Sequence, residues 1–200
     1  MIIGIVLAAG EGKRIGKDKV TLPLGSKKVI EWVLDAATKS KLEKIILVVK
    51  PEDRETAEAG EKYNTIVVSN PDYKKGMSTS IKKALSELNI QNRYDGFCVL
   101  LGDQPFISSD IINSLIEAFQ KGKKEIVVPY FQNKPGNPVL FDIAWKEEFM
   151  NITGDVGGRI LIKAHPDLVK KITLNNEGIL FDIDREEDYK KAKARFAKEK

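Results

Sequence analysis

The fold of this chain follows from one stretch near its start, residues 2–19, which reads IIGIVLAAGEGKRIGKDK. Its first part, residues 2–7, is short, apolar and rich in isoleucine, and this predicts a buried β-strand. Small residues come next, and they let backbone N–H groups approach an anion closely. The rest of the loop carries four cations, namely Lys13, Arg14, Lys17 and Lys19. Because Arg and Lys side chains bind phosphate oxygens, we expect a phosphate site at the carboxyl end of this strand.

The glycine spacing in this loop excludes two common phosphate-binding motifs. A Walker loop has four residues between its glycines and then Lys followed by Ser or Thr. Here five residues separate Gly10 from Gly16, and the next pair is Lys-Asp. A dinucleotide fingerprint needs glycines at its first, third and sixth positions, and the trio of Gly10, Gly12 and Gly16 misses the last of these by one. The second predicted strand also ends in Lys50, where a carboxylate would be expected to hold a ribose.

Outward from this stretch, short apolar runs alternate with amphipathic patterns. The apolar runs predict further strands at 44–49, 65–69, 96–101, 169–174 and 178–183. Helices are predicted at 29–39, 51–63, 78–88, after a cap at Ser108 or Ser109, near Trp145, at 157–164 and at the charged C-terminus. The stretch from 126, including 137–141, is less regular. This order predicts an α/β fold of three layers, α/β/α, with a mostly parallel sheet.

Length and composition narrow the class of protein further. A chain of 200 residues that is 42% hydrophobic and 31% charged predicts one globular domain, residues 1–200. No apolar run approaches the ~20 residues of a membrane span, and the start lacks a basic leader, so neither a membrane protein nor a signal peptide is expected. A single cysteine, Cys98, excludes an intrachain disulfide and favours the reducing cytoplasm.

Charge and histidine content exclude other function classes. The net charge of +4 suits a phosphate-rich ligand. Aromatic residues are not interleaved with the basic ones, so nucleic-acid binding is not expected. The lone histidine, His165, has no nucleophile near it in sequence, which disfavours a Ser-His-Asp or Cys-His hydrolase.

Several motifs along the chain, taken in order, resemble those of the molybdenum cofactor nucleotidyltransferases. Residues 7–19, LAAGEGKRIGKDK, resemble the family signature L-A-A-G-x-S-x-R-M-G-x-x-K. The later motifs are NP at 70–71, GMSTS at 76–80, LGDQP at 101–105, GNP at 136–138, GDVG at 154–157 and FDID at 181–184. Gly12, Ile15, Asn137 and Glu186 depart from the family pattern, which has Ser, Met, His and Pro there. The AAG loop and LGDQP resemble the cytidylyltransferase branch of the family.

This resemblance implies a fold and an activity. The fold would be the Rossmann-like sheet of the GT-A type, with a nucleotide-binding half at about residues 1–105 and an acceptor-binding half at about 106–200. The activity would be Mg²⁺-dependent transfer of a CMP group from CTP to molybdenum-loaded molybdopterin, with release of pyrophosphate. A molybdoenzyme or its chaperone is implied as a protein partner.

The motifs also imply which residues form the site. Residues expected at the nucleotide are Leu7, Ala8, Ala9, Gly10, Gly12, Arg14, Lys19, Asn70, Ser78, Ser80 and Asp103. Residues expected at the acceptor are Gln104, Pro105, Gly136, Asn137, Pro138, Asp155 and Gly157. Arg14, Lys19 and Asp103 are the expected catalytic residues, because this reaction needs positioned charge rather than a His or Cys nucleophile.

Three carboxylates are candidate metal ligands. Asp103 follows a buried strand, where a charge is costly unless it is paired or bound to a metal. Asp182 and Asp184 alternate with apolar residues in a predicted strand, so both would lie on one face, and one could supply a second metal contact. Mg²⁺ suits such a site because it takes one or two carboxylates together with phosphate oxygens and water. Each carboxylate also has a purely structural interpretation. Asp103 could form a turn or cap a helix, and Asp182 and Asp184 could be acidic residues that stabilise the start of the following helix.

Two short segments have both a structural and a functional interpretation. Ser78 and Ser80 lie at the start of a predicted helix. In the structural interpretation one caps the helix and the other exposes its hydroxyl to solvent, whereas in the functional interpretation they contact the base or ribose of the nucleotide. Gly157, Gly158 and Arg159 open another, whose free N–H groups could hold an acceptor phosphate.

Three functions remain open at this point. The first is CMP transfer to molybdopterin. The second is the same fold acting on another acceptor, such as a sugar phosphate, or using GTP in place of CTP. The third is a non-enzymatic nucleotide-binding domain, which the intact set of Arg14, Lys19 and Asp103 disfavours.

Overall fold

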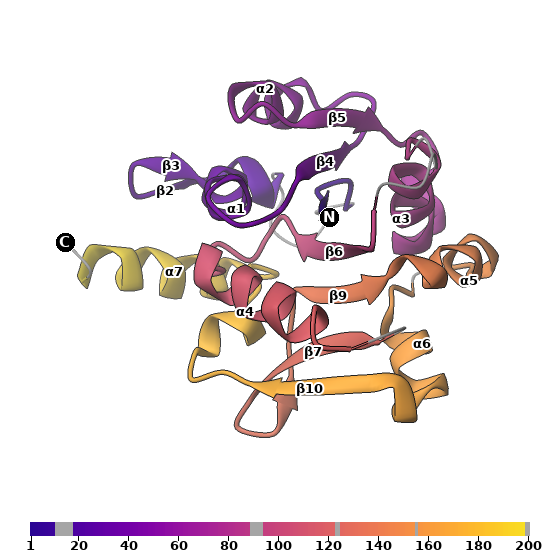
Figure 1. Cartoon of the computed structure of the whole chain (residues 1–200). Coiled ribbons are helices and arrows are strands. Elements are labelled where there is room, and N and C mark those ends of the chain that lie inside the picture. Colours follow the sequence, from indigo (N-terminus) through magenta and orange to yellow (C-terminus); the bar gives the residue numbers. More distant parts are fainter. Residues whose placement is uncertain (11–17, 89–93, 123–124, 155, 199–200) are drawn as a thin grey trace.

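A computed structural model describes residues 1–10, 18–88, 94–122, 125–154 and 156–198. Its central sheet has the strand order β10-β7-β9-β6-β1-β4-β5, with β8 paired to β7 (Figure 1). The strands of this sheet are β1 (Ile2–Leu7), β4 (Lys44–Val49), β5 (Ile66–Ser69), β6 (Gly96–Leu101), β7 (Ile126–Phe131), β8 (Lys134–Pro135), β9 (Val139–Asp142) and β10 (Val169–Thr173). A separate hairpin joins β2 (Pro23–Leu24) to β3 (Lys27–Lys28).

Helices cover both faces of the sheet. The α-helices are α1 (Val29–Thr38), α2 (Arg54–Lys62), α3 (Met77–Ser86), α4 (Ser109–Phe119), α5 (Lys146–Asn151), α6 (Arg159–Ala164) and α7 (Glu186–Lys198). Short 3-10 helices are η1 (Lys19–Thr21), η2 (Tyr73–Lys75), η3 (Ile143–Trp145), η4 (Pro166–Leu168) and η5 (Glu177–Leu180). The predicted three-layer α/β fold is therefore confirmed.

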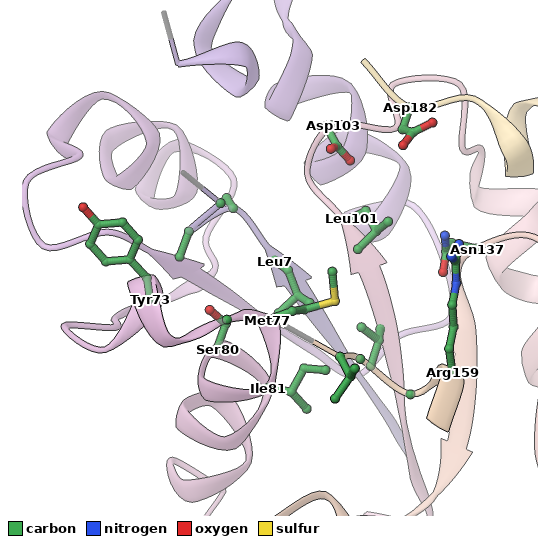
Figure 2. A pocket seen from close by; sticks show the side chains of 18 of the residues that line it. Leu7, Tyr73, Met77, Ser80, Ile81, Leu101, Asp103, Asn137, Arg159 and Asp182 are labelled. Atoms are coloured by element: carbon green, nitrogen blue, oxygen red, sulfur yellow. The ribbon is translucent and has the colours of Figure 1, made fainter. Parts of the chain in front are cut away.

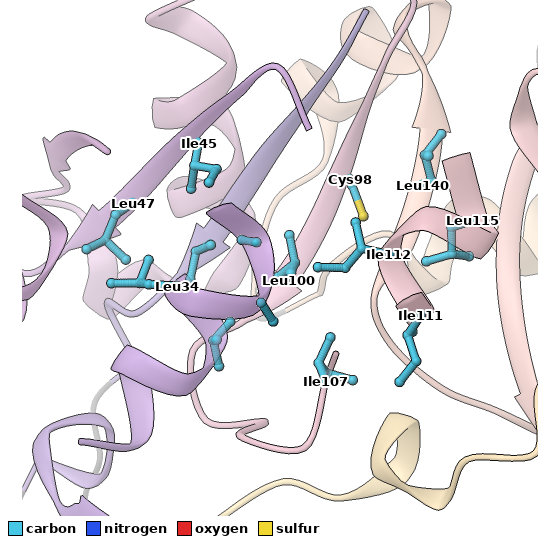
Figure 3. Close-up of a cluster of buried hydrophobic side chains, with 14 of the residues drawn as sticks. Leu34, Ile45, Leu47, Cys98, Leu100, Ile107, Ile111, Ile112, Leu115 and Leu140 are labelled. Carbon is cyan, nitrogen blue, oxygen red and sulfur yellow. The ribbon is translucent and has the colours of Figure 1, made fainter. Parts of the chain in front are cut away.

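Alternation along the strands sends side chains to two separate cores. In β1, Ile2 and Val6 pack with α1, α2 and α4, whereas Ile3 and Ile5 pack with α3, α5 and α6. Figure 3 shows part of the first core, where side chains of α1 and α4 meet those of the strands around Cys98. The Cys98 thiol is fully buried, and burial raises its pKa, so it serves as a small core side chain.

The centre of the sheet is parallel, as predicted, but one strand runs against it. β1 pairs in parallel with both β4 and β6, and β10 pairs in parallel with β7. β9 lies antiparallel between β6 and β7, within the stretch expected to be irregular. Its four residues were too few to show a strand pattern, and its neighbours in the sheet supply the hydrogen bonds that order it.

The strand predicted at 178–183 is wrong. Residues 177–180 form η5, because the Asn176 side chain accepts a hydrogen bond from the backbone N–H of Gly178, at 2.8 Å, and starts a helical turn. Residues 181–184 then run in no strand, and the N–H of Ile183 donates to the carbonyl of Asp103 at 3.1 Å. That bond brings the late segment across the end of β6.

Two helix boundaries depend on caps. The helix expected from residue 51 begins at Arg54, since the Asp53 side chain accepts from the N–H of Thr56 and caps it there. The cap predicted at Ser108 or Ser109 is Ser108, whose side chain accepts from the N–H of Ile111. Among the helices of the described ranges, none is long and apolar enough to cross a membrane.

Candidate functional site

A cavity of about 940 Å³ opens beyond the carboxyl ends of β1 and β6 (Figure 2). The two strands are neighbours in parallel register, with Leu7 opposite Leu101, so the loops that follow them meet at one edge of the sheet. Ligands of open α/β sheets bind at such an edge. The cavity walls come from these loops, from η1, η2 and α3, from β9 and α6, and from the segment after η5.

At the centre of the cavity, one lysine joins two aspartates from distant parts of the chain. The Lys19 ammonium lies 2.5 Å from Oδ2 of Asp103 and 2.6 Å from Oδ1 of Asp184. Burial alone lowers the pKa of Lys19, but the charges and hydrogen bonds of these two carboxylates outweigh it and hold that pKa above its usual value. Lys19 is therefore a fixed positive charge at the edge of the sheet.

Asp103 has an oxygen without a protein partner. Its Oδ1 is buried and accepts no hydrogen bond in the described part of the chain, although Oδ2 is held by Lys19. A buried carboxylate oxygen without a partner is costly, so the position suits a cation. No three Asp, Glu, His or Cys side chains of the described residues are arranged to hold a metal together. The site therefore fits a cation such as Mg²⁺ or Mn²⁺, which completes its coordination with phosphate oxygens and water.

Asp182 and Asp184 both line the cavity, but not as the pair on one strand face that the sequence predicted. The backbone around them is extended without strand pairing, and Asp184 is bound to Lys19. Burial, followed by the negative charges of Asp184 and Asp103, raises the pKa of Asp182. Of these three aspartates, the Lys19 ammonium joins two, Asp103 and Asp184.

We predict that Asp182→Asn stabilises the metal-free protein at neutral pH. A carboxyl whose pKa is raised by folding favours the folded state below its unfolded pKa, and this contribution is lost as the pH rises through the raised value. Asparagine avoids the loss, so we expect the melting temperature at pH 7 to rise by roughly 1–3 °C. The gain should vanish near pH 3, where both side chains are neutral. Melting curves in chelator across this range test it, and a gain that persists at pH 3 would contradict the electrostatic cause.

The structure brings most of the predicted nucleotide-binding residues to the cavity. Those that line it are Leu7, Ala8, Ala9, Gly10, Lys19, Ser80 and Asp103. Asn70 and Ser78 are not among the lining residues. The Asn70 amide donates to Thr79 and Ser80, which holds the turn before α3. Gly12 and Arg14 lie outside the described residues.

Ser78 has a different neighbour from the one expected. Its hydroxyl donates to the carbonyl of Gly154 at 2.8 Å, so it joins the start of α3 to the segment before α6. The side chain is buried, with 2% of its surface exposed. Direct contact with a base or ribose stays a prediction, and the observed bond gives Ser78 a positioning role.

The predicted acceptor-binding residues divide into two groups. Asn137 and Gly157 line the cavity. Gln104, Pro105, Gly136 and Pro138 are buried beside it, and Oε1 of Gln104 has no hydrogen-bond partner among the described residues. Asp155 lies outside the described residues.

Two features of the site were missed from the sequence. Asp18 lines the cavity and pairs with Lys50, which follows β4. The pairing joins the loop after β1 to the end of β4. The sequence hinted at it only through Lys50, which stands where a dinucleotide-binding motif would have a carboxylate. An apolar wall of the cavity includes Met77, Ile81 and Phe141, from α3 and β9. The sequence could not identify this wall, because apolar residues at helix or strand spacing are equally typical of a hydrophobic core.

The chain is similar to known proteins over most of its length. The family described as "MobA-like NTP transferase domain" matches residues 4–169. The purine catabolism protein PucB of Bacillus subtilis is 26% identical over 196 residues, covering 94% of each chain. The molybdenum cofactor cytidylyltransferase of Escherichia coli is 28% identical over 204 residues, covering 96% of this chain and 95% of that protein.

A solved structure with a similar fold contains a metal ion. The complex of Rv0371c from Mycobacterium tuberculosis with manganese has a TM-score of 0.82 and 25% identity, and the match covers 96% of this chain and 97% of that one.

A protein from Natranaerobius thermophilus, named "Probable molybdenum cofactor guanylyltransferase", is 33% identical over 128 residues, or 64% of this chain and 60% of that protein.

Proposed function

Because this chain belongs to the family of MobA-like NTP transferase domains and is a nucleotidyltransferase, we propose that it transfers CMP from CTP to molybdenum-loaded molybdopterin and releases pyrophosphate. The observation that carries the proposal is the arrangement of Lys19, Asp103 and Asp184 around one cavity at the carboxyl ends of β1 and β6. That arrangement supplies positioned charge of both signs, which direct displacement at phosphorus uses.

The reaction assigns separate tasks to the residues of the cavity. A phosphate oxygen of the acceptor attacks the α-phosphorus of the nucleotide, the bond to the bridging oxygen breaks, and pyrophosphate leaves. Lys19 would leave its carboxylates for the triphosphate and stabilise the negative charge on its oxygens in the transition state. The backbone of Ala8–Gly10 would hold the phosphates beside it, with Arg14 of the same loop as the second catalytic cation.

Asp103 would hold Mg²⁺ through its unpartnered Oδ1, with Asp182 or Asp184 as a second ligand. When bound, the metal neutralises charge on the phosphate oxygens. The manganese complex of Rv0371c supports a divalent cation in a protein of this fold, and the choice of Mg²⁺ is part of our proposal.

The proposal divides the cavity between a nucleotide and an acceptor. We assign the nucleotide to the half of about residues 1–105, which supplies Leu7, Gly10 and Ser80, and the acceptor to the half of about 106–200, which supplies Asn137 and α6. A cytoplasmic location, with a molybdoenzyme or its chaperone to receive the product, completes the proposal.

The choice of nucleotide rests on the loop after β1. Its sequence Ala8-Ala9-Gly10 resembles the cytidylyltransferase branch, and the E. coli cytidylyltransferase matches nearly the whole chain. The guanylyltransferase relative matches a smaller share, at somewhat higher identity. The loop sequence and the longer match to the cytidylyltransferase favour CTP, and the guanylyltransferase match makes GTP the alternative to test.

We expect CTP to be the preferred substrate. Pyrophosphate release is measured with each of the four ribonucleoside triphosphates, in Mg²⁺, with and without molybdenum-loaded molybdopterin. Release that is fastest with CTP and depends on molybdopterin supports the proposal. A preference for GTP would replace the cytidylyl assignment. Release with a sugar 1-phosphate but not with molybdopterin would replace the acceptor and leave nucleotidyl transfer intact.

A further inference from the structure

The acidic segment of the site, residues 181–184, depends on side-chain packing for its position. Its residues pair with no strand. The N–H of Ile183 donates to the carbonyl of Asp103 at 3.1 Å, which ties the segment to the end of β6. One hydrogen bond fixes a point of contact and not the path of the chain on either side of it. The rest of the path must therefore be set by what the side chains of the segment touch.

Alternate side chains of the acidic segment lie on opposite sides of it. Asp182 and Asp184 line the cavity, whereas Phe181 and Ile183 pack into a separate apolar cluster beside α7. Ile183 is fully buried in that cluster. Figure 2 shows the side chains of Asp103 and Asp182 close to each other at one end of the cavity. The apolar packing on one side of the segment thus determines where its carboxylates lie on the other.

A row of four rings connects the acidic segment to the loop that carries Asp103. Phe106 lies three residues after Asp103, and its ring centroid is 5.0 Å from that of Phe181, at an interplanar angle of 82°. This edge-to-face arrangement is a favourable one for aromatic pairs. Phe106 also stacks on Phe196 of α7 at 5.2 Å, and Phe196 contacts Trp32 of α1 at 4.6 Å. None of these four rings lines the cavity.

Phe106 is the member of the row that is held from most directions. The Arg195 guanidinium of α7 lies 4.1 Å from the centre of its ring and pairs with Glu177 of η5 at 2.9 Å. The backbone of η5 also approaches closely, because a Cβ on Gly178 would lie 2.9 Å from the Cβ of Phe106. The loop after β6, η5 and α7 are therefore packed around one ring.

From this packing we propose that Phe106 and Phe181 are positioning residues, whose ring contact sets how far the acidic segment lies from Asp103. The proposal rests on the metal-dependent transfer proposed above. Mg²⁺ demands nearly ideal octahedral geometry, so a small displacement of one carboxylate weakens its binding. The two rings act through the carboxylates, since neither ring reaches the cavity.

Phe181→Leu tests the proposal because it removes the ring and keeps an apolar side chain. Without nucleotide, the Kd for Mn²⁺ should rise roughly tenfold, at the lower end of the losses typical when groups that orient metal ligands are changed. Phe181→Tyr keeps the ring and should recover most of the affinity. The loss of the free-ion signal in electron paramagnetic resonance measures Mn²⁺ binding by each protein.

Phe119→Leu is the matched control. Phe119 is a buried residue of α4 in another core and does not line the cavity. Both leucine variants should lower the melting temperature by roughly 2–4 °C, but only Phe181→Leu should weaken Mn²⁺ binding. Equal Mn²⁺ affinity of wild type and Phe181→Leu, an equal loss in Phe119→Leu, or no binding by wild type overturns the proposal.

The metal requirement of the reaction separates positioning from a general structural defect. In Phe181→Leu, the Mg²⁺ concentration for half-maximal pyrophosphate release should rise roughly tenfold. At saturating Mg²⁺, kcat and the KM for CTP should match those of wild type. A kcat that is lower at every Mg²⁺ concentration would make Phe181 merely structural. If the Mn²⁺ results hold but wild type does not turn over molybdopterin, the proposed function is wrong and the positioning role stands.

Discussion

Asp103→Asn is expected to lower kcat/KM for nucleotidyl transfer by roughly 100- to 1,000-fold, the range seen when one group that stabilises transition-state charge is removed. Asparagine keeps the size of the side chain but loses the charge on Oδ1, the buried oxygen that no described residue satisfies. Lys19 keeps its contact with Asp184 at 2.6 Å, so the free energy of unfolding should fall by no more than ~2 kcal/mol. Single-turnover rates and denaturant unfolding on the same preparation compare the two losses.

Asp167→Asn is a suitable control for this experiment. Asp167 is exposed in η4 and does not line the cavity, so its loss should change neither rate nor metal dependence. If Asp103→Asn retains activity within about tenfold, a difference of ~1.4 kcal/mol, then Asp103 is not the principal metal ligand. A loss of rate matched by an equal loss of stability would make the residue structural.

Lys19→Met should have two opposite effects. Turnover should fall by roughly 10- to 150-fold, because a charge-assisted contact to the triphosphate is worth ~1.5–3 kcal/mol. Binding of Mn²⁺ without nucleotide should become tighter, since Asp103 and Asp184 are no longer neutralised by the ammonium. Mn²⁺ affinity is measured by the loss of the free-ion signal in electron paramagnetic resonance, and turnover by pyrophosphate release.

The control for this change is another lysine in an ion pair. Lys41 lies 2.8 Å from Glu117 on the surface, and Lys41→Met should leave both Mn²⁺ binding and turnover unchanged. If Lys19→Met weakens Mn²⁺ binding, the ammonium does not compete for the carboxylates. The site would then depend on Lys19 to hold Asp103 and Asp184 in place.

The first half of the site could be predicted from the sequence because its signals are local. An apolar run followed by small residues indicates a buried strand that leads into a phosphate loop, and β1 ends at Leu7 as predicted. The buried run of β6 likewise leads to Asp103, which lines the cavity. Since the carboxyl ends of neighbouring parallel strands meet at one edge, these local patterns also predicted the edge at which the cavity lies.

The second half of the site depends on contacts between distant segments. Periodicity in FDID suggested a strand, but the cap at Asn176 and the bond from Ile183 to Asp103 decided the path of the chain. The same holds for β9, which became a strand because β6 and β7 offered it free hydrogen-bonding edges. Such competition between a weak local preference and a tertiary partner cannot be resolved within one segment.

The sequence by itself determined the layered fold and the edge of the sheet at which the cavity lies, with Lys19 and Asp103 lining it, because apolar period and strand direction follow from neighbouring residues. Only the tertiary structure decided that Asp184, 165 residues from Lys19, shares its ammonium. It also decided that Ser78 holds the carbonyl of Gly154. The reason is physical: a charge or a hydrogen bond acts over a few ångströms in space, whatever the separation along the chain.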